Sequence, residues 1–406
     1  MKESLAGTLH ADEAKQKLPW RDWILLPTIA IATIVVLFAT TETVARMAFP
    51  AWHSSPSCYI LNGGRNPRPT PNCVYTLKIP ESEPAIYHLN SCGHRTEIDC
   101  AHKAPGTYRI AVIGSSVVVG APVSEQNAFV HLLAAKFPEP EEGKRIEFYN
   151  ASLGGGSSPQ WYVERFNEIL AVKPDMILWP IVPHDVEVEQ EPGPPPPAYP
   201  GPLGETRYAL VEAWKARSMN QAMSVVSGLI RTNLNQTSSA TMLEHFLYLS
   251  PTEYQKVVMA DHAEHGFLKA RFDADWRNHI RLFSGDAAAI EEKAQSAGIP
   301  LVAFMIPDRG TINMLSLGSW PDGWNPYELD NELRRIVTSH GGIYFDILPA
   351  FQTIPDAALD YFPVNDHPNE EGHKLLASLI ARELANTSPL DLRGVGSLET
   401  ISKVEK

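Results

Sequence analysis

Apolar runs and helical repeats alternate along the carboxyl-terminal two thirds of this 406-residue chain. Short apolar runs bounded by turn residues predict buried strands at residues 110–113, 146–149, 176–182, 300–306 and 343–346. Apolar positions at helical spacing predict helices at residues 124–137, 159–172, 326–339 and 370–385. Strands that alternate with helices form a parallel sheet covered on both faces. We therefore expect an α/β fold, a flavodoxin-like three-layer sandwich.

The alternation is interrupted between the third and fourth predicted strands. Residues 191–202, EPGPPPPAYPGP, form a proline-rich connector that can be neither a helix nor a central strand. It opens an excursion to about residue 298 that is mostly helical in pattern and too long for an ordinary crossover. We expect a helical insert capping one end of the sheet. Its Phe246, Tyr248 and Trp276 can line a substrate entrance or touch a membrane, and packing against the body is the default.

An uncharged apolar stretch lies near the amino terminus. Residues 23–41, WILLPTIAIATIVVLFATT, span roughly 28 Å as a helix, close to the thickness of a bilayer core. We expect a transmembrane anchor over residues 23–48; a cleaved signal peptide is the alternative, but the apolar core is long for one and no clean A-x-A site follows. Basic residues are denser before the stretch than after it, which favours a cytoplasmic tail over residues 1–22 and an exported body.

Four cysteines, the only ones in the chain, lie between the anchor and the first predicted strand, at Cys58, Cys73, Cys92 and Cys100. Clustered thiols on the exported side, without C-x-x-C spacing, favour two disulfides over zinc ligands. Pairing in sequence order is the simplest of three connectivities, and the sequence does not choose among them. We expect residues 49–106 to form a loop-rich stalk that leads into a body over residues 107–406. The net charge of −13 and the absence of a dense Lys and Arg run argue against nucleic-acid partners.

Residues 109–120, RIAVIGSSVVVG, place two serines on a turn directly after the first predicted strand. Ligands of open α/β sheets bind at this carboxyl edge, so a serine there is a candidate nucleophile if a base lies within reach. The alternative is an ordinary helix N-cap at Ser115 or Ser116. Three later segments follow strands or precede the last helix: NASLGGGSSPQ at residues 150–160, VPHD at 182–185 and VNDHPNEEGH at 364–373. The glycine loop can present amides to an oxyanion, and it lacks the G-K-[ST] of a phosphate loop.

Taken together, these four blocks resemble the SGNH/GDSL hydrolase family in their order and spacing. The resemblance implies that Ser116 is the nucleophile, with its own amide in the oxyanion hole, and that His367 is the general base. It also implies a second oxyanion donor at Gly155 and a third at His184, which stands where the family has an asparagine. The turn itself is Gly-Ser-Ser instead of Gly-Asp-Ser.

The residue that usually orients the histidine is missing from the last block. The family's acid falls on Val364, which has no group to offer the imidazole. Asp366 is the nearest carboxylate and is our candidate third catalytic residue, although adjacent side chains need an unusual backbone to meet. Asn365 or a main-chain carbonyl can orient the base instead.

These features predict an exported, membrane-anchored serine esterase or deacylase. Its ester substrate can be an O-acyl group on envelope carbohydrate, and its expected location is the inner membrane, with the body on the periplasmic or extracytoplasmic side. An O-acyltransferase with the same serine and histidine is one alternative, and a non-catalytic envelope binding protein with a degraded triad is another. The mechanism requires neither a metal nor an organic cofactor.

Several other residues have competing interpretations. His262 and His265 are spaced for one helix face and can bind a metal, but no further ligands are evident and a solvated face is favoured. Tryptophans can stack on a sugar, with core packing as the default for Trp161, Trp179, Trp320 and Trp324. Asp308 and Asp346 follow predicted strands and are expected to satisfy turns.

Overall fold

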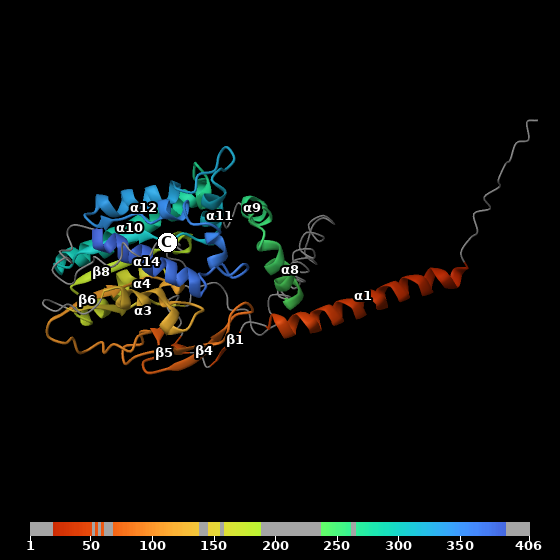
Figure 1. Cartoon of the computed structure of the whole chain (residues 1–406), viewed down its shortest axis with the longest axis horizontal. Coiled ribbons are helices and arrows are strands. Elements are labelled where there is room, and N and C mark those ends of the chain that lie inside the picture. The colour runs from red at the N-terminus through yellow and green to blue at the C-terminus, as the bar shows by residue number, and fades with distance from the viewer. Residues whose placement is uncertain are drawn as a thin grey trace, which may run out of the picture.

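The computed structural model describes residues 19–50, 53–55, 58–60, 68–137, 145–154, 158–187, 237–260 and 265–386. Within these ranges the chain folds around a five-stranded sheet, from whose body one long helix projects (Figure 1).

The sheet is parallel throughout and confirms the predicted fold class. Its strands are β6 (Thr107–Val112), β7 (Arg145–Asn150), β8 (Met176–Ile181), β9 (Leu301–Met305) and β10 (Ile343–Tyr344), in the spatial order β10-β9-β8-β6-β7. This is the flavodoxin-like order, in which the chain adds one strand beyond β6 and then reverses. The reversal lies between β6 and β8, where Ile110 pairs with Met176. Ligand sites in such sheets form at the carboxyl ends of the strands beside this point.

Helices cover the sheet in two groups. In one, α3 (Phe129–Lys136) packs against α14 (Glu370–Asn386); in the other, α10 (Ala274–Ser296) packs against α4 (Pro159–Ala171) and α12 (Glu328–Ser339). The predicted helix over residues 124–137 is divided into a short 3₁₀ turn, η1 (Glu125–Asn127), and α3. Strands β8 and β9 are buried along their whole length, as the continuous apolar runs predict for strands covered on both faces.

The predicted helical insert ends earlier in the chain than expected. Its last helix, α10, is a crossover helix of the sheet, because Phe283, Ala287 and Ile290 are buried in the same core as β8 and β9. The described part of the insert that stands apart from the sheet is therefore α8 (Ser238–Tyr248) with α9 (Pro251–Ala260). The proline-rich connector, residues 191–202, lies outside the described residues. Shorter elements complete the body: α2 (Ser116–Val119), α5 (Pro183–Glu187), η2 (Gly266–Leu268), α11 (Arg309–Leu317), α13 (Leu348–Phe351) and η3 (Ala357–Asp360).

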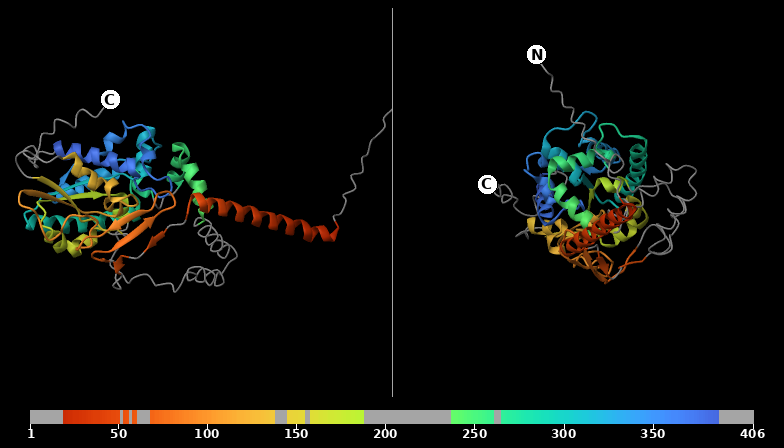
Figure 2. Two further views of the ribbon diagram at one scale, coloured as in Figure 1. Left: turned by 60° about the horizontal axis from the view of Figure 1, so that its bottom comes forward. Right: turned by 90° about the vertical axis from the view of Figure 1, so that its right-hand side faces the viewer.

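Helix α1 (Trp20–Ala48) is, among the described residues, the one helix long and apolar enough to cross a membrane, with a mean hydropathy of 2.3 in its most apolar window. It projects from the end of the body at which α8 lies (Figures 1 and 2). Its apolar side chains are exposed along most of its length.

The cysteine-containing segment contains more structure than a loop-rich stalk. An antiparallel sheet joins β1 (His53–Ser55), β4 (Val74–Lys78) and β5 (Ala85–His88), and a smaller ladder joins β2 (Tyr59–Ile60) to β3 (Arg68–Pro69). Disulfides link Cys58 to Cys73 and Cys92 to Cys100, the pairing in sequence order. Tyr75, Tyr87 and Leu77 share a small core with Val119 of α2, so this segment packs directly on the body.

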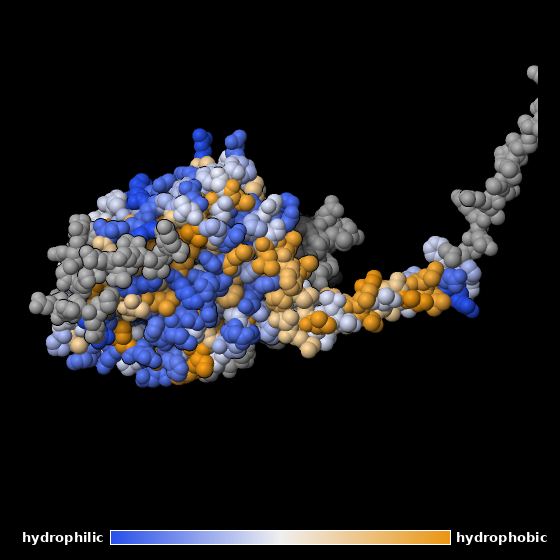
Figure 3. Space-filling model, viewed as in Figure 1, coloured by the Kyte–Doolittle hydropathy of each residue, from blue (hydrophilic) through white to orange (hydrophobic). Residues whose placement is uncertain are grey.

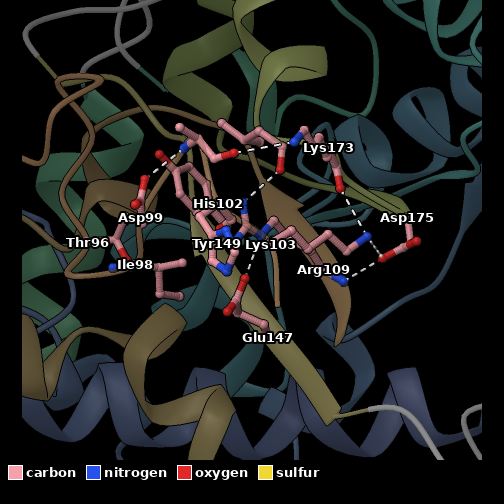
Figure 4. A network of polar contacts seen from close by, with 12 residues as sticks. Thr96, Ile98, Asp99, His102, Lys103, Arg109, Glu147, Tyr149, Lys173 and Asp175 are labelled. Atoms are coloured by element: carbon pink, nitrogen blue, oxygen red, sulfur yellow. Dashed lines mark hydrogen bonds and ion pairs between the residues drawn. The ribbon is translucent and has the colours of Figure 1, made fainter. Parts of the chain in front are cut away.

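A buried arginine fastens the segment just after the Cys92–Cys100 disulfide to the amino end of the sheet (Figure 4). Arg109 of β6 donates to Glu147 of β7 and, at 2.8 Å each, to the carbonyl oxygens of Val172 and His102. Asp175 accepts from the Arg109 amide and from Lys103. Since the Arg109 side chain is almost fully buried, these partners are what make its charge tolerable in the interior.

Candidate active site

A cleft of about 270 Å³ opens at the carboxyl ends of β6, β8 and β9. Five segments that are distant in sequence line it: the turn after β6, the α5 segment after β8, the η2 segment at residues 265–267, the start of α11 after β9, and the loop before α14. Its lining residues include Ser115, Ser116, His184, His265, Asp308, Asn365, Asp366 and His367. The cleft therefore lies where the strand reversal between β6 and β8 predicts a ligand site.

The turn that presents Ser116 requires a glycine before it. Gly114 has φ +151°, and a Cβ there would lie 2.4 Å from Cγ2 of Val118, so even an alanine would clash with α2. The buried Tyr162 hydroxyl ties this turn to the glycine loop. It donates to the Gly114 carbonyl at 2.6 Å and accepts from the amides of Gly114 at 2.9 Å and Leu153 at 3.0 Å.

Ser116 and His367, separated by 251 positions in the chain, meet in the cleft. The Ser116 Oγ lies 2.8 Å from Nε2 of His367. On the other side of the ring, Nδ1 lies 3.2 Å from the main-chain carbonyl of Asn365, which can only accept, so Nδ1 carries the proton and Nε2 can accept the serine proton. Burial lowers the pKa of His367, and the charge of His184 acts in the same direction. The base is therefore neutral at neutral pH.

The Asp366 side chain is held by a residue of helix α9. The residue adopts the left-handed conformation, with φ +65°, and its Oδ1 accepts from the Tyr254 hydroxyl of α9 at 2.8 Å. Burial, together with the negative charge of Asp308, raises the pKa of Asp366 to about 7. Among the described contacts, the group that meets Nδ1 of His367 is the Asn365 carbonyl, one of the two alternatives the sequence left open, and not Asp366.

Glu81, which sequence analysis did not single out, holds the loop that carries the base. It lies in the turn between β4 and β5, and its side chain is only 1% exposed. Its carboxylate accepts from the Val364 amide, at 3.0 and 3.1 Å, and from the Asn365 amide at 2.8 Å. His245 of α8 donates to it at 2.7 Å. The same short segment thus donates its amides to Glu81 and accepts from His367 through the Asn365 carbonyl. No local pattern marks Glu81, since it lies more than 280 positions from the loop it binds.

The three candidate oxyanion donors are the Ser116 amide, Gly155 and His184. The Ser116 amide is in the first turn of α2, where backbone N–H groups have no intrahelical acceptor. Gly155 lies outside the described residues. His184, in α5, lines the cleft with a side chain that is 57% exposed, and its Nδ1 lies 3.2 Å from Glu187. The proposed part of His184 in the oxyanion hole stays a prediction.

Most of the other residues that the sequence singled out lie in the core or cap turns. His262 lies outside the described residues, and the described residues contain no group of three or more potential metal ligands around His265 or elsewhere. Trp161, Trp179 and Trp324 are buried in the core, and Trp320 packs against Tyr327. Asp308 caps α11 by accepting from the Thr311 amide at 2.9 Å, and Asp346 accepts from the Leu348 amide. Asp308 also lines the cleft.

No protein-family model matches the sequence, and the search of curated proteins finds no match. Among solved structures, the chain is similar to a lipase/acylhydrolase from Enterococcus faecalis at 14% identity and a TM-score of 0.35, over 69% of this chain and 96% of that one. It is also similar to an alpha/beta hydrolase enzyme from the metagenome of Lake Arreo, Spain (16%, TM-score 0.33, 74% and 100%), and to a lipolytic G-D-S-L family protein from Veillonella parvula (13%, TM-score 0.31, 70% and 100%). At these identities and scores the likenesses assign no activity to the chain.

Replacing Asp366 by asparagine is expected to leave most of any turnover of a short nitrophenyl ester intact. Asparagine tolerates the left-handed backbone and keeps an oxygen for Tyr254. The pKa of Asp366, about 7, lies above its ordinary value of 3.8, so folding must overcome the cost of ionising this buried carboxyl. The folded protein loses stability as the pH rises from 3.8 to 7, and the full loss is present above pH 7. We expect Asp366→Asn to melt at an equal or higher temperature at pH 8 and to lose less than about threefold in kcat. A loss near 10⁴-fold, typical of removing a triad acid, would show that Asp366 orients His367 after all.

Replacing Glu81 by alanine is expected to lower kcat for a short nitrophenyl ester by about 10²-fold, the effect of misplacing a catalytic group by about 1 Å. KM should change little, because Glu81 is not among the residues that line the cleft. Glu81→Gln keeps an oxygen for the two amides and should recover most of the activity. The matched control is Glu83→Ala, an exposed glutamate on the same turn. Normal kcat in folded Glu81→Ala would refute the positioning role.

Proposed function

We propose that this chain is a membrane-anchored serine esterase or deacylase whose catalytic pair is Ser116 and His367. The observation that carries the proposal is the 2.8 Å contact between Ser116 Oγ and Nε2 of His367, inside a cleft at the carboxyl edge of a parallel sheet. A serine hydroxyl bonded to a neutral imidazole, whose other nitrogen is held by a fixed acceptor, is the arrangement that nucleophilic acyl transfer requires. The sequence blocks around both residues support the same reaction.

The geometry suggests the following steps. Ser116 Oγ attacks the ester carbonyl carbon while its proton moves to Nε2 of His367, and the Asn365 carbonyl accepts the Nδ1 hydrogen bond of the imidazolium that forms. The Ser116 amide, with Gly155 and His184 as further proposed donors, stabilises the oxyanion. Collapse breaks the bond to the alcohol, which leaves with the proton from Nε2. A water molecule then gives a proton to Nε2 as it attacks the acyl carbon. Collapse of this second intermediate breaks the bond between the acyl carbon and Ser116 Oγ, Nε2 returns its proton to Oγ, and the carboxylic acid leaves.

The proposed setting is the outer side of the inner membrane. Helix α1 supplies a candidate anchor, and two disulfides suit an oxidising compartment. Intact mass measurement of the chain from membranes separates a retained anchor from a cleaved signal sequence. The substrate class that fits this setting is an O-acyl ester of envelope carbohydrate, and we include it in the proposal.

Fluorophosphonate labelling of the full-length chain in detergent tests the catalytic pair. We expect mass spectrometry to find the adduct on Ser116 in the wild type, and labelling to be lost in Ser116→Ala and strongly slowed in His367→Ala. Release of nitrophenol from short esters should follow the same pattern. A folded wild type that neither reacts with the probe nor turns over esters would instead favour a binding protein with a degraded triad.

The rate of labelling is expected to fall on acidification with a midpoint below pH 6.5. Only neutral His367 can accept the serine proton, and its pKa is lowered by burial, so protonation requires a lower pH than for an exposed histidine. The rate should be followed between pH 4.5 and 8 in wild type and in Asp366→Asn. The asparagine variant removes one carboxyl of the cleft whose pKa, about 7, lies in this window, while the buried Asp185 beside His184, with a pKa of about 6, is present in both proteins. A midpoint above 6.5 in both proteins would contradict a neutral, buried base.

A further inference from the structure

Helix α8 carries an apolar face that the body does not cover. Leu243, Phe246 and Leu247, at positions i, i+3 and i+4, lie on one side of the helix with 69%, 63% and 42% of their surface exposed. Leu249 follows just after the helix and is exposed as well. Outside α1, these are four of the eight large apolar side chains that are exposed among the described residues. Such clustering marks an interaction surface rather than chance exposure.

This face is continuous with the candidate membrane helix. In the space-filling view, hydrophobic surface runs from α1 onto the adjoining end of the body (Figure 3). The amides of Ser238 and Ser239, at the start of α8, donate to the Glu42 carboxylate of α1 at 3.2 and 3.0 Å. Phe49, one residue after α1, packs its ring against those of His245 and Phe246 at 5.0 and 6.3 Å.

The contact with Glu42 fixes the height of α8 along α1. Glu42 is the first charged residue after the uncharged stretch at residues 23–41, so it marks the level at which the hydrocarbon core ends. Because the first amides of α8 are bound to that carboxylate, α8 begins at the same level. A helix at this depth, with leucine and phenylalanine on its open side, occupies the position of an interfacial membrane helix.

We propose that the Leu243–Phe246–Leu247 face of α8 inserts into the interfacial region of the bilayer and holds the body against the membrane surface. The inference rests on the part of the proposed function in which α1 spans the membrane. The bound partner is the lipid acyl and headgroup boundary, reached by apolar contact. Since α8 contains no Lys or Arg, the contact needs no anionic lipid.

The same docking brings the active site near the lipid surface. Helix α9, which follows α8 directly, donates to Asp366 in the cleft through Tyr254, and His245 of α8 contacts Glu81, which holds the His367 loop. The view along α1 shows α8 and α9 together at the anchor end of the body (Figure 2, right). The ester class that this placement favours is one presented at the membrane surface.

The test uses the full-length chain in phosphatidylcholine nanodiscs with one thiol-reactive NBD probe. All four native cysteines are in disulfides, so a single introduced thiol is labelled under non-reducing conditions. The test position is Phe246→Cys. Val35→Cys, exposed in the middle of α1, reports whether α1 spans the bilayer, and Lys293→Cys, exposed near the end of α10, reports a surface that faces water. Each sample is compared in discs with and without lipids carrying doxyl groups near the headgroup or deeper in the chain.

We expect the Phe246→Cys probe to emit at shorter wavelength than the Lys293→Cys probe and to lose intensity with shallow doxyl lipids, equally in neutral and anionic discs. The Val35→Cys probe should be quenched by deep doxyl lipids.

Quenching at Val35→Cys without quenching at Phe246→Cys would overturn the docking of α8 while leaving the anchor intact. A blue shift at Phe246→Cys without lipid quenching would mean that protein covers the face, and would also overturn it. Quenching at neither position would remove the anchor and the docking together. Fluorophosphonate labelling of Ser116 in the same discs reports the catalytic proposal separately.

Discussion

The approach of His367 to Ser116 depends on a buried carboxylate that binds the backbone of the intervening loop. The loop before α14 has no acidic side chain of its own directed at the base, and Asp366 adopts a left-handed conformation within it. Glu81 fixes this loop by accepting both the Val364 and Asn365 amides, and hydrogen bonds to an ionised group are stronger than neutral ones, about 1.5–3 kcal/mol each. Because the Glu81 side chain is only 1% exposed, these hydrogen bonds replace those that water would make and offset the cost of burying the carboxylate. The interaction therefore stabilises the loop in the one arrangement that presents the Asn365 carbonyl to the imidazole.

Glu81 is one of three contacts by which the cysteine-containing segment shapes the cleft. Tyr59, beside Cys58, lies against the glycine loop, where a Cβ at Gly154 would come within 2.8 Å of the phenol oxygen. Arg95, inside the Cys92–Cys100 disulfide loop, donates to the carbonyls of Val119, Gly120 and Val123, which follow the nucleophile turn. A disulfide that closes a loop of about 15 residues contributes on the order of 3 kcal/mol by limiting the unfolded chain. The cross-links thus hold a segment that supports three of the site's loops.

Sequence patterns predict the parallel sheet and the edge at which Ser116 and His367 lie. Burial imposes a strict periodicity on strands and helices, and parallel strands end at a common edge. They fail where long-range contacts decide the outcome. Adjacency in sequence made Asp366 the candidate partner of His367, but its positive φ turns the carboxylate towards Tyr254. Helix α10 shares the polar and apolar repeat of α8, and only its packing in the core separates a crossover helix from the insert. Nothing near Glu81 in the sequence reveals that its partners lie beyond residue 360.

The contacts of α8 make the candidate membrane helix α1 and the proposed base His367 parts of one connected structure. Glu42 of α1 accepts from the start of α8, His245 near its end donates to Glu81, and Glu81 accepts from the loop that ends at His367. Each link includes an ionised carboxylate, and the Glu81 link is shielded from water, so it is weakened little by salt. A chain joined to its anchor by a flexible linker alone would sample every orientation above the membrane. Here the packing of Phe49 on α8, together with these links, restricts the body to one side of α1, so the position of the cleft relative to the anchor is a property of the fold.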